Sequence, residues 1–136
     1  KTMTDTINLS DATWAAVECL LWSSTLLDVE QDPTSEYFVS ECENWDGVDY
    51  PVDPDSVANL QSELESFIEL CESDLIASKL DPGQIGHDFI LTRNGHGTGF
   101  WDRGLDEIGD RLTKWAKTFG TIESLYIDTQ NCIAWE

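Results

Sequence analysis

The sequence has 136 residues, of which 40% are hydrophobic and fourteen are aromatic, and its 27 acidic residues outnumber seven lysines and arginines to give a net charge of −20. This length and apolar content predict one folded domain, residues 1–136, and argue against a disordered chain. The charge disfavours direct binding to nucleic acid or to an anionic membrane, and no apolar run approaches the roughly 18 to 20 residues of a membrane span.

The spacing of apolar residues predicts three helices. The first covers about residues 11–28 and is apolar on more than one side. The second has Asp53 as its N-cap and Pro54 at its first position, and apolar residues recur at three- and four-residue steps to about Ser78. The third covers residues 105–119.

Two pairs of strands are predicted in the second half of the chain. Residues 87–93 are expected to pair, across the glycine-rich residues 94–99, with a short strand at residues 100–101. Residues 122–127 and 132–135 are expected to form a second hairpin. Three helices with two short β-hairpins predict an α+β domain with a small antiparallel sheet.

The charge is segregated along the sequence. Residues 2–78 hold eighteen aspartates and glutamates but no lysine, arginine or histidine, whereas residues 79–136 hold all but one of the basic residues. We therefore divide the domain into an acidic helical half, 2–78, and a mixed-charge half, 79–136. An uninterrupted anionic field attracts basic protein surfaces, so the expected partner is a cationic protein face.

The cysteines indicate reduced thiols. Their spacing contains no C-x-x-C pair and fits no zinc site, so we expect no metal site and no cofactor. The four residues are Cys19, Cys42, Cys71 and Cys132.

The segment from Gly86 to Gly104 has a distinctive sequence, GHDFILTRNGHGTGFWDRG. With the pattern that continues through residues 109–112 to residues 125–126, it resembles a family of small acidic proteins encoded by bacteriophages. The resemblance covers about residues 44–128. It implies a phage origin and a cytoplasmic location in the host cell, but no activity and no catalytic residues.

Acids on the second predicted helix lack basic neighbours. Glu65, Glu69 and Glu72 recur at i, i+4 and i+7 opposite the apolar stripe, where each like-charge pair costs about 0.2–0.5 kcal/mol. Carboxylates at i and i+4 lie about 5–6 Å apart, comparable with the charge spacing along a DNA strand. This pattern is typical of a DNA mimic, an inhibitor that blocks a basic, DNA-binding host protein of a restriction, CRISPR or repair system. The predicted partner-binding residues are Asp28, Glu30, Asp32, Glu36, Glu41, Glu43, Asp46, Asp49, Asp53, Asp55, Glu65, Glu69 and Glu72.

Other functions remain open. A structural or scaffold protein of a phage would carry the same solvated acidic faces. A small metal-dependent enzyme would use His87 and His96, which lie in the predicted hairpin near Asp88 and Asp102. No nucleophile or phosphate-binding signature accompanies these histidines, so no catalytic residue is assigned. Residues 29–53 are expected to form an acidic loop. Oxygen ligands for calcium in this loop are a further alternative, although the loop does not fit the EF-hand pattern.

The basic residues of the second half form a modest patch. Arg103, Arg111, Lys114 and Lys117 are too few to supply the phosphate contacts of a nucleic-acid-binding protein. We expect the patch to pair with the acidic half or with a second copy of the chain, which would give a homodimer.

Overall fold

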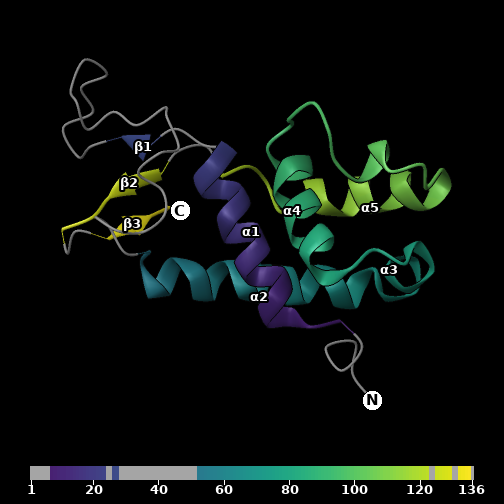
Figure 1. Ribbon diagram of the computed structural model, residues 1–136, viewed down its shortest axis with the longest axis horizontal. Coiled ribbons are helices and arrows are strands. Elements are labelled where there is room, and N and C mark those ends of the chain that lie inside the picture. The colour runs from purple at the N-terminus through teal and green to yellow at the C-terminus, as the bar shows by residue number, and fades with distance from the viewer. Residues whose placement is uncertain (1–6, 24–25, 28–51, 123–124, 130–131, 136) are drawn as a thin grey trace.

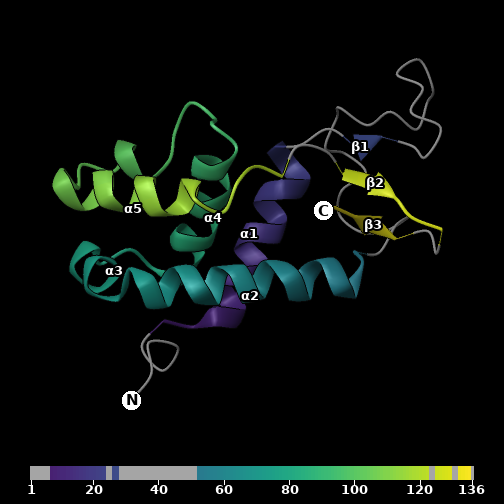
Figure 2. The same cartoon turned by 180° about the vertical axis from the view of Figure 1, so that it is seen from behind.

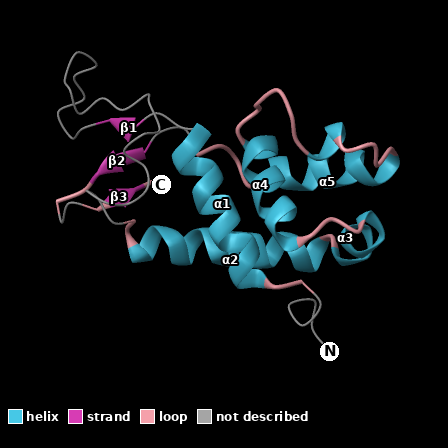
Figure 3. Cartoon of the chain, in the orientation of Figure 1, coloured by secondary structure: helices cyan, strands magenta, loops and turns pink. Residues whose placement is uncertain are grey.

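The computed structural model describes residues 7–23, 26–27, 52–122, 125–129 and 132–135. Helices make up most of this structure (Figures 1 and 3). Among the described residues, no helix has the length and apolar composition of a membrane span. The elements are α1 (Leu9–Ser23), β1 (Leu26–Leu27), α2 (Pro54–Leu70), α3 (Glu72–Ser78), α4 (Pro82–Arg93), the 3-10 helix η3 (Phe100–Asp102), α5 (Glu107–Lys117), β2 (Leu125–Ile127) and β3 (Ile133–Ala134).

The small sheet and the helix pair α3 and α5 lie at opposite ends of the molecule. Between them, α1 crosses α2 and packs along α4, and the views from the two sides agree on this arrangement (Figures 1 and 2). Four phenylalanines join the helices. Phe67 of α2 lies with its ring centroid 4.8 Å from that of Phe89 and 5.5 Å from that of Phe100, and Phe119 meets Phe89 edge-on at 5.4 Å. Such aromatic pairs add about 0.5–1.5 kcal/mol beyond area burial.

The predicted second helix is two helices in the structure. Its start is confirmed, because the Asp53 carboxylate accepts a hydrogen bond from the Ser56 N–H at 3.0 Å and Pro54 follows the cap. Its continuity is wrong. At Cys71 the backbone adopts φ −110° and ψ 22°, which ends α2 and begins α3. In Figure 1, α3 turns away from the line of α2.

The predicted strand at residues 87–93 is wrong, because these residues belong to helix α4. Asp81 caps this helix by accepting a hydrogen bond from the Gln84 N–H at 2.7 Å, and Pro82 occupies its first turn. Every residue from 88 to 93 is buried, so the helix shows no one-sided apolar pattern and its sequence resembles a buried strand. Residues 94–99 therefore lead from α4 to η3, and the first predicted hairpin is replaced by helical structure.

The terminal hairpin is confirmed. Strands β2 and β3 are antiparallel, with Tyr126 opposite Ala134. An unpredicted third strand, β1, pairs with β2 in parallel, and Leu26 lies opposite Leu125. On the other side, Val52 bridges to Ile133 of β3, next to the start of α2. The described part of the chain is α+β, with five α-helices rather than the three predicted and a small sheet.

Candidate functional site

The predicted partner-binding acids fall into two groups. Five belong to the start of α2, its outer face and the start of α3, and are discussed below. The other eight lie outside the described residues: Asp28, Glu30, Asp32, Glu36, Glu41, Glu43, Asp46 and Asp49.

Asp53 caps α2, as the sequence predicted, and also joins this helix to the sheet. It is half-buried, and its Oδ2 accepts hydrogen bonds from both the N–H and the hydroxyl of Ser56, each at 3.0 Å. Its own N–H donates to the carbonyl of Ile133 at 2.8 Å. Asp53 therefore holds the start of α2 against β3 and is a poor candidate for binding a partner.

The other four described acids, Asp55, Glu65, Glu69 and Glu72, are exposed. None of them forms an ion pair with a described residue. Glu65 and Glu69 lie one turn apart on α2, whereas Glu72 opens α3 beyond the break, so the predicted i, i+4, i+7 series does not follow one straight helix. Asp55 and Glu72 lie in first turns, where the helix dipole favours a negative charge. We call these four residues the acidic face.

The three arginines bind other acids inside the same chain. Each pair joins two segments that are distant in sequence, and in two of the pairs the guanidinium donates two hydrogen bonds to one carboxylate. The pairs are Arg93 with Glu63, Arg103 with Asp88 and Arg111 with Asp74. No acid of the acidic face is neutralised by them.

Asp88 is fully buried on α4 and is held by Arg103. The Arg103 Nε and Nη2 atoms lie 2.9 and 2.7 Å from its two oxygens, and Gln84 donates a third hydrogen bond at 2.9 Å. The hydrogen bonds to Asp88 raise the pKa of Arg103. This pair anchors the segment after η3 to α4.

The distinctive segment, residues 86–104, owes several of its polar residues to such contacts. The Thr92 hydroxyl accepts a hydrogen bond from the Phe100 N–H at 3.2 Å, and the Asn94 side chain accepts one from the Ile122 N–H at 2.8 Å. Arg93 and the pair of Asp88 with Arg103 add further contacts. Together these interactions give the segment a structural role in holding the fold together.

The geometry expected for a histidine site is absent, because the proposed hairpin is a helix followed by a turn. His87 lies on α4 and His96 lies beyond its end. Asp88 is engaged by Arg103, and Asp102 accepts a hydrogen bond from the Thr98 hydroxyl at 2.9 Å. In the ranges that the structure describes, no three histidine, cysteine, aspartate or glutamate side chains are placed to hold a metal ion.

The described cysteines, Cys19, Cys71 and Cys132, are not joined in disulfides. Burial raises the pKa of the Cys19 and Cys71 thiols to about 12. Because the thiolate is the reactive form, these two side chains behave as small core residues. Cys42 lies outside the described residues.

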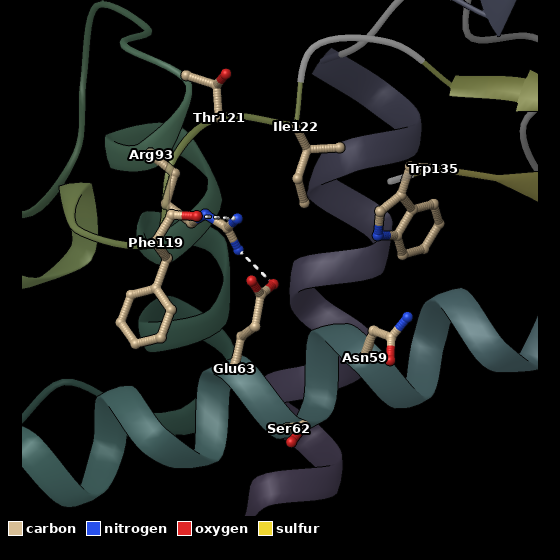
Figure 4. A pocket seen from close by; sticks show the side chains of 8 residues that line it. All are labelled: Asn59, Ser62, Glu63, Arg93, Phe119, Thr121, Ile122 and Trp135. Atoms are coloured by element: carbon tan, nitrogen blue, oxygen red, sulfur yellow. Dashed lines mark hydrogen bonds and ion pairs between the residues drawn. The ribbon is translucent and has the colours of Figure 1, made fainter.

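A cleft of about 420 Å³ opens between α2, the end of α4 and the segment after α5 (Figure 4). Arg93 and Glu63 meet inside it, with Nη1 2.9 Å from Oε1. Arg93 also donates from Nε to the Gly120 carbonyl at 2.8 Å and from Nη2 to the Phe119 carbonyl at 3.0 Å. The lining residues are Asn59, Ser62, Glu63, Arg93, Phe119, Thr121, Ile122 and Trp135.

The sequence could not have indicated this cleft, because its walls come from segments far apart in the chain. Arg93 and Glu63 are separated by 30 positions, and Trp135 joins them from the end of the described chain. The one available signal was an arginine at the end of an apolar run, which has to find a partner when buried.

Comparison with models of known families, with curated proteins and with solved structures finds no match. The resemblance to a family of acidic phage proteins therefore stays a prediction.

Proposed function

We propose that this chain is a phage-encoded acidic inhibitor that acts in the host cytoplasm. Its exposed carboxylates imitate the charges of DNA and bind a basic, DNA-binding protein of a host defence or repair system. One observation carries the proposal. The three arginines form ion pairs with Glu63, Asp74 and Asp88, whereas the acidic face is exposed and has no ion-pair partner among the described residues.

This division of the acids has an electrostatic consequence. The arginine pairs cancel within the fold, so among the described residues the charges of the acidic face are left at the surface without a local ion-pair partner. A surface of one sign accelerates association with a surface of opposite sign and makes binding sensitive to salt. A cationic DNA-binding groove meets this description of a partner.

The helical support fixes part of the acidic face before binding. Glu65 and Glu69 lie on a well-packed helix whose opposite side buries Leu60, Leu64 and Phe67. Adjacent turns of the helix hold such carboxylates about 5–6 Å apart. Because the helix is already ordered, binding would cost little backbone entropy.

The test is competition with DNA on a matched pair of variants. The wild-type protein is immobilised, a bacterial lysate is applied at low and high salt, and bound proteins are eluted with duplex DNA and identified. We expect a DNA-binding protein that duplex DNA displaces and that high salt releases. Its affinity and its salt dependence should both fall in the variant Asp55→Asn, Glu65→Gln, Glu69→Gln, Glu72→Gln.

The matched control removes the same number of charges from α1 and α5. It carries Asp11→Asn, Glu18→Gln, Glu107→Gln and Asp110→Asn, all at exposed positions. Equal weakening in both variants would mean that only net charge matters. Unchanged affinity in the acidic-face variant would overturn the proposal.

The expected homodimer rests on fewer residues than the sequence suggested. Arg103 and Arg111 are engaged by Asp88 and Asp74, which leaves exposed Lys114 and Lys117 on α5 as the remainder of the basic patch. If these lysines bind the acidic half of a second copy, light scattering should give a dimer mass that Lys114→Glu, Lys117→Glu reduces to that of a monomer.

A further inference from the structure

The cleft around Glu63 has a volume of about 420 Å³ and is open to solvent. Its floor is the ion pair of Glu63 with Arg93, whose side chain is 3% exposed. In Figure 4 the Glu63 carboxylate rises from α2 toward Arg93, and the Trp135 ring and Asn59 lie on the other side of the cleft. The exposed side chains of Asn59, Ser62 and Thr121 form polar parts of the lining.

The charges in and around the cleft disfavour an anionic ligand. Arg93 already donates to Glu63 and to the carbonyls of Phe119 and Gly120, and its guanidinium also lies 5.9 Å from the centre of the Phe119 ring. Each nitrogen of the Arg93 guanidinium therefore already donates one hydrogen bond within the fold, and an anion would meet the Glu63 carboxylate in a field of net charge −20.

A cation is attracted by the net charge of −20 and can reach the Glu63 carboxylate beside Arg93. The Glu63 side chain is 37% exposed, and only its Oε1 atom is bound by Arg93, so Oε2 is available as an acceptor. Asn59 precedes Glu63 by one helical turn, and its side-chain carbonyl is a second acceptor on the same part of α2. Trp135 adds an aromatic wall, against which a flat cation packs well.

We propose that the cleft binds a guanidinium group, such as the arginine side chain that a basic partner would insert. A guanidinium is planar and carries five donors in a fixed fork, which suits several separate acceptors beside an aromatic ring better than a compact ammonium does. The identity of the partner rests on the proposed function, whereas the preference of the cleft for this group does not.

The probe is ethylguanidinium, with ethylurea as its neutral analogue of similar shape. Each is titrated into the isotope-labelled protein while the amide and indole N–H resonances are followed by NMR. We expect saturable shifts for Trp135, Ile122 and the Asn59 side-chain amide with ethylguanidinium and none with ethylurea. Equal responses to both probes, or no response to either, would overturn the proposal.

Two variants of equal charge locate the site. Asn59→Arg places a guanidinium one turn from Glu63, where it should occupy the cleft from within and abolish the response to ethylguanidinium. Gln61→Arg adds the same charge at an exposed position of α2 that does not line the cleft, and should leave the response unchanged. Shifts that persist in Asn59→Arg would mean that the cation binds elsewhere on the acidic surface, against the proposal.

The same variants separate this inference from the proposed function. If both are correct, Asn59→Arg should weaken binding to the captured partner about tenfold or more, as for a central anchoring contact. Gln61→Arg should have a much smaller effect. A partner whose affinity depends on the acidic face but not on Asn59→Arg would remove the inserted arginine and leave the inhibitor proposal intact. The titration with ethylguanidinium needs no partner and can succeed or fail by itself.

Discussion

Gly86 of α4 and Ala12 of α1 meet backbone to backbone. A Cβ atom on Gly86 would overlap the carbonyl oxygen of Ala12 and lie 2.8 Å from its carbonyl carbon and 3.1 Å from the Ala16 nitrogen. These atoms belong to a helix backbone and cannot rotate away. The close crossing of α1 and α4, the most extensive helix contact of the described chain, therefore requires glycine at position 86.

Gly86→Ala should accordingly destabilise the protein by about 1–3 kcal/mol, the usual cost of overpacking. The intrinsic helix propensity of alanine acts in the opposite direction, by about 1 kcal/mol. Urea denaturation gives the free energy of unfolding. The control is Gly97→Ala, where a Cβ would meet nothing within 4 Å. A Gly86→Ala protein as stable as Gly97→Ala would contradict the observed crossing.

The Asp88 and Arg103 pair should respond asymmetrically to mutation. Arg103→Met leaves a fully buried carboxylate with only Gln84 as a side-chain donor, and breaking a buried pair in this way costs about 3–5 kcal/mol. Asp88→Asn leaves a guanidinium whose side chain is 29% exposed and can be hydrated in part. We expect the smaller loss for Asp88→Asn in urea denaturation at pH 7. Equal losses would indicate that water reaches Asp88.

The Asp74 and Arg111 pair predicts a pH dependence. The hydrogen bonds from Arg111 lower the pKa of Asp74 below its ordinary 3.8 in the folded protein. The carboxylate therefore stabilises the fold fully above pH 3.8, and this contribution is lost as the pH falls through the lowered pKa. The difference in unfolding free energy between wild type and Asp74→Asn should be constant from about pH 5 to 7 and shrink at lower pH. Both partners are partly exposed, so this difference in unfolding free energy is small. In an Arg111→Gln background, the effect of Asp74→Asn should no longer depend on pH in this way.

The buried thiols should resist alkylation. With a pKa of about 12, Cys19 and Cys71 would be ionised in only about one molecule in ten thousand at pH 8. Cys132 is only half-buried and should be labelled by iodoacetamide before Cys19 and Cys71, as judged by mass spectrometry of the labelled peptides. Labelling of Cys19 and Cys71 should follow unfolding in urea. Fast labelling of Cys19 in the native protein would show that α1 readily separates from the core, and fast labelling of Cys71 would show the same for the junction of α2 and α3.

A local signal predicted the start of α2, whereas the same signal at Asp81 and Pro82 did not lead to the prediction of α4. The start of α2 follows from an aspartate cap and a proline, both of which act within one turn. The break at Cys71 has no such signal, because neither glycine nor proline is present there and hydrogen bonds to Phe67 and from Leu75 continue the helical pattern on both sides. Helix α4 was mistaken for a strand because burial on all sides removed its period.

In the candidate site, too, the features set by local sequence could be predicted and those set by long-range packing could not. Exposure of Glu65 and Glu69 could be predicted, because a helix places both opposite its apolar stripe. The acids that pair with the three arginines could not be predicted, because they lie 15 to 37 positions away in the sequence and the pairing depends on how the helices cross. The cleft depends on the same long-range packing.

The sheet fixes the positions of two residues, Leu27 at the end of β1 and Val52 beside β3. Leu27 ends β1 at one edge and Val52 bridges to β3 at the other, so the two residues that flank positions 28–51 lie at opposite edges of the same three strands. Three inter-strand steps of about 4.8 Å place these two residues roughly 14 Å apart. A linker of about six residues could bridge that gap. Positions 28–51 include eight of the thirteen predicted partner-binding acids, and the sheet fixes the distance between the two residues that flank them.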